Sequence, residues 1–258
     1  MATLKISSLQ GLEKFGTALL NDGLPDMLRW FRSKKKAALL MDEVHKHIFD
    51  LGPPTPPGKP TGRRRYHQWL MHHVSEIRTS IDTMKDIEFY AGRFPYRKTK
   101  IAKHRHLQFH VEAYLNELYI LRERLTQFLK FIERQHRRDP RLPQIEAACK
   151  VLKDFVIEAM KKGIAIRSSH VHQWRLSDTQ LDRLNGISLY TEMPNRKIRK
   201  AFMAFYESEY RQIRRRWCEW MADGTARAQE LVDSYFDEVF KLIFTPRGRL
   251  VYPSRLKF

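Results

Sequence analysis

Residues 107–132 of this 258-residue chain read LQFHVEAYLNELYILRERLTQFLKFI, and this stretch decides the fold. Its apolar side chains recur in alternating steps of four and three, the spacing of a helix face that packs along other helices. The seam consists of Leu107, Val111, Tyr114, Leu118, Leu121, Leu125, Phe128 and Ile132. The pattern predicts a long helix in an antiparallel helical bundle.

The same period appears on both sides of this seam. Upstream it predicts a helix over residues 64–91, with Leu70, Val74, Ile77, Ile81, Met84 and Ala91 on one stripe. Downstream it predicts a helix over residues 145–161, with an apolar side of Cys149, Leu152, Phe155, Val156 and Met160. Lys162-Gly163 is interpreted as the C-terminal cap of that helix.

Short sequence patterns predict the structure of the remainder of the chain. Residues 177–180 predict the start of a short helix, Asn185-Gly186 a turn, and residues 197–244 the last long helices. Strand-like alternation is confined to residues 187–190. We therefore expect an all-α protein: an N-terminal helical extension with a proline-rich connector over residues 1–65, followed by a helical bundle over residues 66–258.

The charge of the chain indicates an anionic partner. It has 48 Lys and Arg against 29 Asp and Glu, a net charge of +19, and enough apolar residues, 42%, to build a core. Basic blocks occur at residues 32–36, 63–65, 97–100 and 214–216. A single block is as often a solvated face as a binding site, but four blocks with this excess indicate an anionic partner, either nucleic acid or a membrane surface. The membrane surface is the less favoured partner, because no single predicted helix combines a wide apolar face with a wholly basic one.

Several classes of protein are excluded by what the sequence lacks. It has no P-loop, no dinucleotide-binding glycine motif, no G-x-S-x-G and no H-E-x-x-H. No apolar run is long enough to cross a bilayer, and residues 1–24 lack the apolar stretch of a signal peptide. The two cysteines, Cys149 and Cys218, lie far apart. We expect a cytoplasmic protein without a membrane partner, and no disulfide scaffold.

Two histidines have the spacing of metal ligands but the wrong neighbours. His106 and His110 are four residues apart on one predicted helix face, and two imidazoles at this spacing can share a zinc ion. Lys103 and Arg105 flank them, and no acidic residue or cysteine stands at ligand spacing. The sequence therefore predicts no metal and no cofactor.

Residues 164–174, IAIRSSHVHQW, carry the sharpest candidate site. Arg167 and His172 are separated by four residues, and His170 lies between them. The Arg-to-His spacing of four to six residues occurs four times in the chain, so the surroundings select this pair. In a basic, all-helical chain the pair resembles the Arg-x4–6-His motif of the HEPN family. The resemblance covers about residues 103–244.

The HEPN resemblance implies a metal-independent endoribonuclease that acts in prokaryotic defence or a toxin–antitoxin system. By that resemblance, Arg167 would bind the phosphate, His172 would act as general base or acid, and His170 would assist. Such a protein would be a homodimer, with RNA as substrate and an antitoxin or defence-system protein as partner. Arg167 could instead pair with Asp154 or Glu158 and have a structural role.

Further basic residues are candidate RNA contacts. Lys161 and Lys162 precede the motif, and Arg214, Arg215 and Arg216 lie in a predicted helix that interleaves basic and aromatic residues. Such aromatic side chains can stack on bases, or they can be the core that the arginines flank. The alternative function is a basic helical module that binds RNA, DNA or a protein without catalysis.

Overall fold

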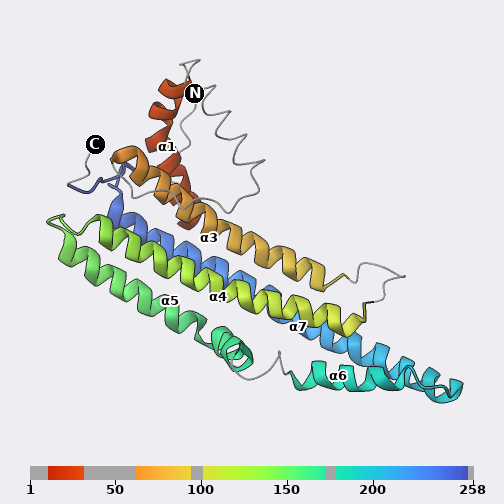
Figure 1. Cartoon of the computed structure of the whole chain (residues 1–258). Coiled ribbons are helices and arrows are strands. Elements are labelled where there is room, and N and C mark those ends of the chain that lie inside the picture. The colour runs from red at the N-terminus through yellow and green to blue at the C-terminus, as the bar shows by residue number, and fades with distance from the viewer. Residues whose placement is uncertain (1–10, 32–61, 94–100, 172–177, 255–258) are drawn as a thin grey trace. The chain divides into compact units, whose positions relative to one another are not determined.

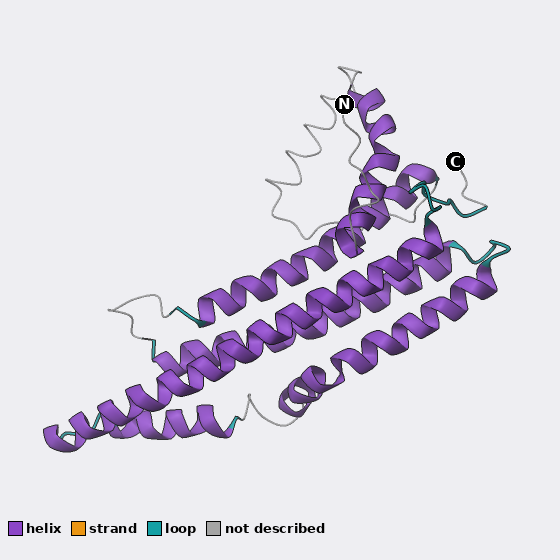
Figure 2. Cartoon of the chain, turned by 180° about the vertical axis from the view of Figure 1, so that it is seen from behind, coloured by secondary structure: helices purple, strands orange, loops and turns teal. Residues whose placement is uncertain are grey.

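The computed structural model describes residues 11–31, 62–93, 101–171 and 178–254 and is all-α in this part of the chain (Figure 2). The described helices are α1 (Gly11–Phe31), α3 (Arg63–Ala91), α4 (Lys103–Gln135), α5 (Leu142–Val171), α6 (Thr179–Tyr190) and α7 (Arg196–Ile243) (Figure 1). The proline-rich connector lies outside the described residues. None of the described helices has the length and apolar character needed to cross a membrane.

The chain divides into two compact units, each built from segments that are far apart in the sequence. Unit 1 comprises residues 1–76, 128–152 and 232–258, and unit 2 comprises residues 77–127 and 153–231. Helices α3, α4, α5 and α7 each contribute residues to both units.

The predicted seams form the core. All eight seam residues of α4 are buried, as are the six stripe residues of α3. In unit 2 the hydroxyl of Tyr114 donates a hydrogen bond to the carbonyl oxygen of Met221 on α7, at 2.9 Å. Burial raises the pKa of Tyr114 to about 12, so its hydroxyl keeps the proton that it donates.

Helix α1 belongs to the core of unit 1. The ring of Phe15 packs edge-on against Phe236 and Phe244, with ring centroids 4.9 and 5.0 Å away. The first amides of α1 are capped by α7, because the backbone N–H of Gly11 and that of Leu12 donate to carboxylates of Asp237 and Asp233. These acceptors satisfy N–H groups that have no partner within the helix.

Three predictions about local structure are wrong, and in each case tertiary packing overrides a weak local signal. Gly163 does not cap α5, which continues to Val171; a Cβ at Gly163 would collide with Cδ2 of Leu118, so glycine permits a close approach to α4. Helix α6 runs through the predicted turn at Asn185-Gly186 and includes residues 187–190, because Leu181, Leu184 and Ile187 form a buried helical stripe. The last segment is one helix of 48 residues.

Candidate nucleic-acid interface

The predicted catalytic residues lie at the C-terminal end of α5. Arg167 and His170 are in the last turns of this helix, and their side chains are outside the described part of the chain, as is the whole of His172. The helix continues through Arg167, whereas the sequence had indicated a cap before it. The catalytic roles of the three residues therefore stay predictions.

A dense group of exposed basic residues lies on the first half of α7. Residues 196–216 contain eight Lys and Arg and two acidic residues. At about 100° per residue, six of the basic residues fall within an arc of about 100°. We call these six the α7 basic face: Arg196, Lys197, Lys200, Arg211, Arg214 and Arg215. All are exposed except Arg214, which is half-buried.

The two acidic residues of this half of α7 are each in an ion pair with another helix. Glu207 accepts hydrogen bonds from Nζ of Lys103 on α4, at 2.6 and 2.8 Å. Glu209 lies 3.3 Å from Nη2 of Arg183 on α6. Because their charges are balanced from outside α7, they do little to cancel the positive potential of the α7 basic face.

The opposite side of α7 is core, as the alternative interpretation of its aromatic residues proposes. Tyr206, Tyr210 and Ile213 are buried in unit 2. The phenol oxygen of Tyr206 accepts a hydrogen bond from the backbone N–H of His104, at 3.2 Å. Burial raises the pKa of Tyr206 to about 12. Phe202 and Phe205 differ from these residues, since Phe202 is half-buried and Phe205 is 43% exposed.

The five predicted RNA-contacting residues do not share one surface. Arg214, Arg215 and Arg216 follow one another and so point in directions about 100° apart around α7. Arg214 lies over the ring of Tyr210 at 5.6 Å, while Arg215 and Arg216 are exposed. Lys161 and Lys162 are exposed on α5, and Nζ of Lys161 lies 3.3 Å from Glu158.

His106 and His110 contact one another on α4. Their Nε2 atoms are 3.2 Å apart, so that one imidazole N–H donates to the other ring. Burial lowers the pKa of both residues, which favours the neutral form that the accepting ring needs. Within the described residues, no three His, Cys, Asp or Glu side chains come together as a metal site would require.

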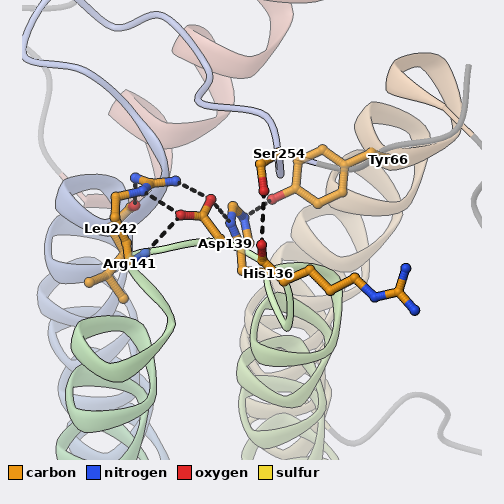
Figure 3. Close-up of polar contacts among 7 residues, drawn as sticks. Tyr66, His136, Asp139, Arg141, Leu242 and Ser254 are labelled. Carbon is orange, nitrogen blue, oxygen red and sulfur yellow. Dashed lines mark hydrogen bonds and ion pairs between the residues drawn. The ribbon is translucent and has the colours of Figure 1, made fainter.

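Sequence reasoning missed a buried polar cluster in unit 1 (Figure 3). The hydroxyl of Tyr66 lies 3.0 Å from Nε2 of His136, whose Nδ1 lies 3.2 Å from the carboxylate of Asp139. Arg141 donates to both oxygens of Asp139, at 3.1 and 2.9 Å. Tyr66 and His136 are 70 residues apart and lie in unrelated patterns, so nothing in the sequence joins them.

The charges in this cluster are arranged for stability. Hydrogen bonds from Arg141 hold the pKa of Asp139 well below its usual range, so Asp139 is a carboxylate. Burial lowers the pKa of His136 and raises that of Tyr66, so both are neutral. Tyr66 and His136 are fully buried. A substrate cannot reach this Tyr–His–Asp chain, which instead joins the turn between α4 and α5 to α3.

Comparison of the chain with protein-family models, with curated proteins and with solved structures found no match.

Proposed function

We propose that this protein binds RNA along the α7 basic face. The observation that carries the proposal is the separation of charge over residues 196–216 of α7: the basic side chains of the α7 basic face reach solvent, and the two acidic residues of this stretch pair with α4 and α6. Lys200 and Arg215 are 15 residues apart, about 22 Å along the helix. This length spans several phosphates of an extended strand.

The test compares two triple variants with the same net charge. In the first, Lys197→Gln, Lys200→Gln and Arg211→Gln remove exposed charges from the α7 basic face. In the control, Lys85→Gln, Arg227→Gln and Lys241→Gln remove exposed charges that pair with Asp82, Asp223 and Glu238. RNA affinity is measured by fluorescence anisotropy between about 50 and 300 mM NaCl, the range in which counterion release is read.

Binding through phosphates predicts a specific change in salt dependence. Each lost phosphate contact reduces the slope of log K against log salt by about 0.7 to 0.9, so the first variant should lose about two units of slope and at least about ten-fold in affinity at low salt. The control should keep the wild-type slope. Equal weakening of both variants would mean that total charge, and not the α7 basic face, holds the RNA.

Cleavage of the bound RNA is the second proposed activity. It rests on the HEPN resemblance and on one feature of α5: Arg167 and His170 are three residues apart on a continuous helix, so their backbone positions share one side. Such an enzyme would act as a cytoplasmic homodimer, restrained by an antitoxin or defence-system protein. The test incubates total RNA and tRNA with the protein in EDTA, beside His172→Ala. Cleavage by the wild type alone supports the activity, and intact RNA in both samples leaves binding as the function.

A further inference from the structure

Arginines from three stretches that are far apart in the sequence lie at one end of unit 1 (Figure 1). The stretches are residues 62–66 at the start of α3, residues 134–144 around the turn between α4 and α5, and residues 244–254 after α7. Together they contain nine Arg and no Lys, although the chain has 20 Lys, and a single acidic residue, Asp139. The positive charge of this end therefore comes from guanidinium groups alone.

Direct contacts hold the three stretches together. The guanidinium carbon of Arg63 lies 4.8 Å from the centroid of the Tyr252 ring. The hydroxyl of Ser254 donates a hydrogen bond to the carbonyl oxygen of Arg138 at 3.0 Å (Figure 3). The guanidinium of Arg141 donates to a carbonyl oxygen in the last turn of α7 at 3.4 Å. The arginines of the three stretches therefore belong to one surface.

This surface, which we call the arginine end of unit 1, is open to solvent. Five of its six arginines are exposed, and the sixth, Arg141, is half-buried. Gly248, with a φ of 72°, closes the turn that carries two of them. The six residues are Arg63, Arg137, Arg138, Arg141, Arg247 and Arg249.

The carboxylates of Asp22 and Asp139 lie at this end, and both are hydrogen-bonded within unit 1. Asp22 of α1 accepts from the backbone N–H of Leu250 at 3.3 Å and from the hydroxyl of Tyr252 at 2.7 Å. Asp139 accepts from Arg141, as described above. Two negative charges against nine arginines leave a large positive excess at the arginine end.

The next acidic residues along α4 and α5, Glu133 and Glu146, are set back from the exposed arginines. Burial raises the pKa of the Cys149 thiol to about 12, and the charges of Glu133 and Glu146 add to this effect. Both carboxylates therefore lie near Cys149, which is about two turns into α5. Their charge acts mainly on the core between these helices.

Guanidinium groups are well suited to phosphate. Each stays charged at any physiological pH and presents its N–H donors in a planar fork that matches two phosphate oxygens. The arginines of this end come from three separate stretches and do not form one line along a helix. A duplex, which carries about one negative charge per 1.7 Å of its axis on two neighbouring strands, matches such a broad surface of cations.

The arginine end has no exposed ring on which an unpaired base could stack. In the described residues of the three stretches, Tyr66, Phe244 and Leu250 are buried, and Tyr252 is half-buried with Arg63 over its ring. Proteins that bind single strands combine a basic surface with exposed aromatic rings, and helices that insert into a bilayer interface need exposed apolar side chains. The surface therefore favours the backbone of a duplex over a single strand or a membrane.

We propose that the arginine end of unit 1 binds the sugar–phosphate backbone of double-stranded RNA. Such contacts recognise the shape of the duplex and its phosphates and do not read the bases. The inference goes beyond the α7 basic face, which lies in unit 2, and it rests on the proposed function only in the choice of RNA as the nucleic acid.

The test uses an RNA duplex of about 16 base pairs, a duplex DNA of the same sequence and an unstructured single-stranded RNA of the same length. Arg137→Gln, Arg138→Gln and Arg247→Gln together remove three exposed charges from the arginine end. The control is the triple variant of the paired residues Lys85, Arg227 and Lys241, which has the same net charge. Affinities are measured by fluorescence anisotropy between about 50 and 300 mM NaCl, and circular dichroism verifies that each variant is folded.

We expect the variant of the arginine end to lose about two units or more of the slope of log K against log salt on the RNA duplex. Its duplex affinity at low salt should fall at least about ten-fold, because each lost phosphate contact reduces the slope by about 0.9. Its affinity for the single strand should fall by less than about three-fold. The control should keep the wild-type slope on both RNAs.

Several outcomes would overturn the inference, and they separate it from the proposed function. A wild-type slope on the duplex would show that the arginine end is only a solvated surface, and equal losses on both RNAs would refute the preference for a duplex. Binding of duplex DNA without binding of duplex RNA, or loss of binding only to vesicles that contain phosphatidylserine, would identify a different ligand. The α7 triple variant tests the proposed function by itself: if it binds RNA as the wild type does while the variant of the arginine end does not, the proposed function fails and this inference stands.

Discussion

At the scale of single residues, two glycines in helices show how the same substitution can have opposite effects. A Cβ at Gly224 would lie 2.7 Å from the hydroxyl oxygen of Tyr114, which donates to the carbonyl of Met221. A Cβ at Gly186 would meet no atom within 4 Å. The space around each glycine therefore decides whether its substitution by alanine stabilises or destabilises the protein.

We expect Gly224→Ala to lower the free energy of unfolding and Gly186→Ala to raise it. The first displaces a buried hydroxyl from its hydrogen bond at a cost of about 1 to 3 kcal/mol, more than the gain in helix propensity of about 1 kcal/mol. Gly186→Ala causes no collision, so only the gain in helix propensity remains, about 0.5 to 1 kcal/mol. Urea denaturation measures both, and a stabilised Gly224→Ala would contradict the close contact.

His73 should make the stability of the protein depend on pH. Its ring packs between Phe128 and Phe131, at 5.3 and 5.1 Å, and burial lowers its pKa to about 4 in the folded state. The unfolded chain, with a histidine pKa of about 6.5, binds the proton first as the pH falls. The stability that neutral His73 contributes is therefore lost progressively from about pH 6.5 down to about pH 4.

His73→Phe should remove this loss, because a phenyl ring keeps the aromatic packing and does not titrate. We expect its melting temperature to fall less than that of the wild type between about pH 7 and pH 5. Melting at about pH 8, where neither state of the wild type holds the proton, isolates the effect of packing alone. Parallel pH profiles for the two proteins would show that another group causes the acid sensitivity.

At the scale of elements, the turn between α4 and α5 depends on Asp139. This 9% exposed carboxylate accepts hydrogen bonds from the side chain and the backbone N–H of Arg141 and from His136. Asp139→Ala would leave these donors without an acceptor and should destabilise the protein by about 2 to 4 kcal/mol. Asp154→Ala, at an exposed position on α5, should change stability by less than about 0.5 kcal/mol. Equal denaturation midpoints for the two variants would refute the role of the cluster.

The helices differ in how far their sequences predict them. The seam of α4 and the stripe of α3 are predictable because a long repeat with apolar residues at helical spacing has one stable arrangement, and every residue assigned to either is buried. Phe155 is predicted to be core but is 45% exposed, because it falls just outside the stripe formed by Cys149, Leu152 and Val156. The ends of α5 and α6 were mispredicted because glycine and Asn-Gly are weak stop signals inside helices that are packed on one side.

The candidate sites could be predicted only in part, for a different reason. Basic residues on α7 are visible in the sequence, but the pairing of Glu207 with Lys103, 104 residues away, is not. The arginine end of unit 1 likewise depends on contacts between distant stretches, such as that of Arg63 with Tyr252. Contacts between helices determine the electrostatic potential of a site and the exposure of its side chains. Sequence periodicity shows only which face of each helix is apolar.

At the scale of the whole molecule, the net charge of +19 should make the folded state sensitive to salt. Self-repulsion opposes compaction, and salt screens it over about 10 Å at 0.1 M. The exposed pairs Arg78–Asp82 and Arg227–Asp223 contribute little that salt could remove.

We therefore expect the melting temperature to rise between about 10 and 200 mM NaCl. The rise should be smaller in the triple variant of the α7 basic face, which carries three fewer positive charges. Differential scanning calorimetry would measure both transitions. A melting temperature that falls with salt would mean that attractive ion pairs outweigh the repulsion.

The division of the chain into units has a consequence for how this protein can be shortened or recombined. Unit 1 is assembled from three stretches of sequence and unit 2 from two, so neither can be expressed as one uninterrupted fragment. Deletion of residues 1–65 removes α1, and with it the ring of Phe15 that packs against Phe236 and Phe244. During synthesis α7 is the last helix to appear, and each unit needs part of it: unit 2 the residues up to 231 and unit 1 the residues from 232. Folding of either unit must therefore wait for nearly the whole chain, and exchange of functional modules by cutting at a single point would leave two incomplete halves.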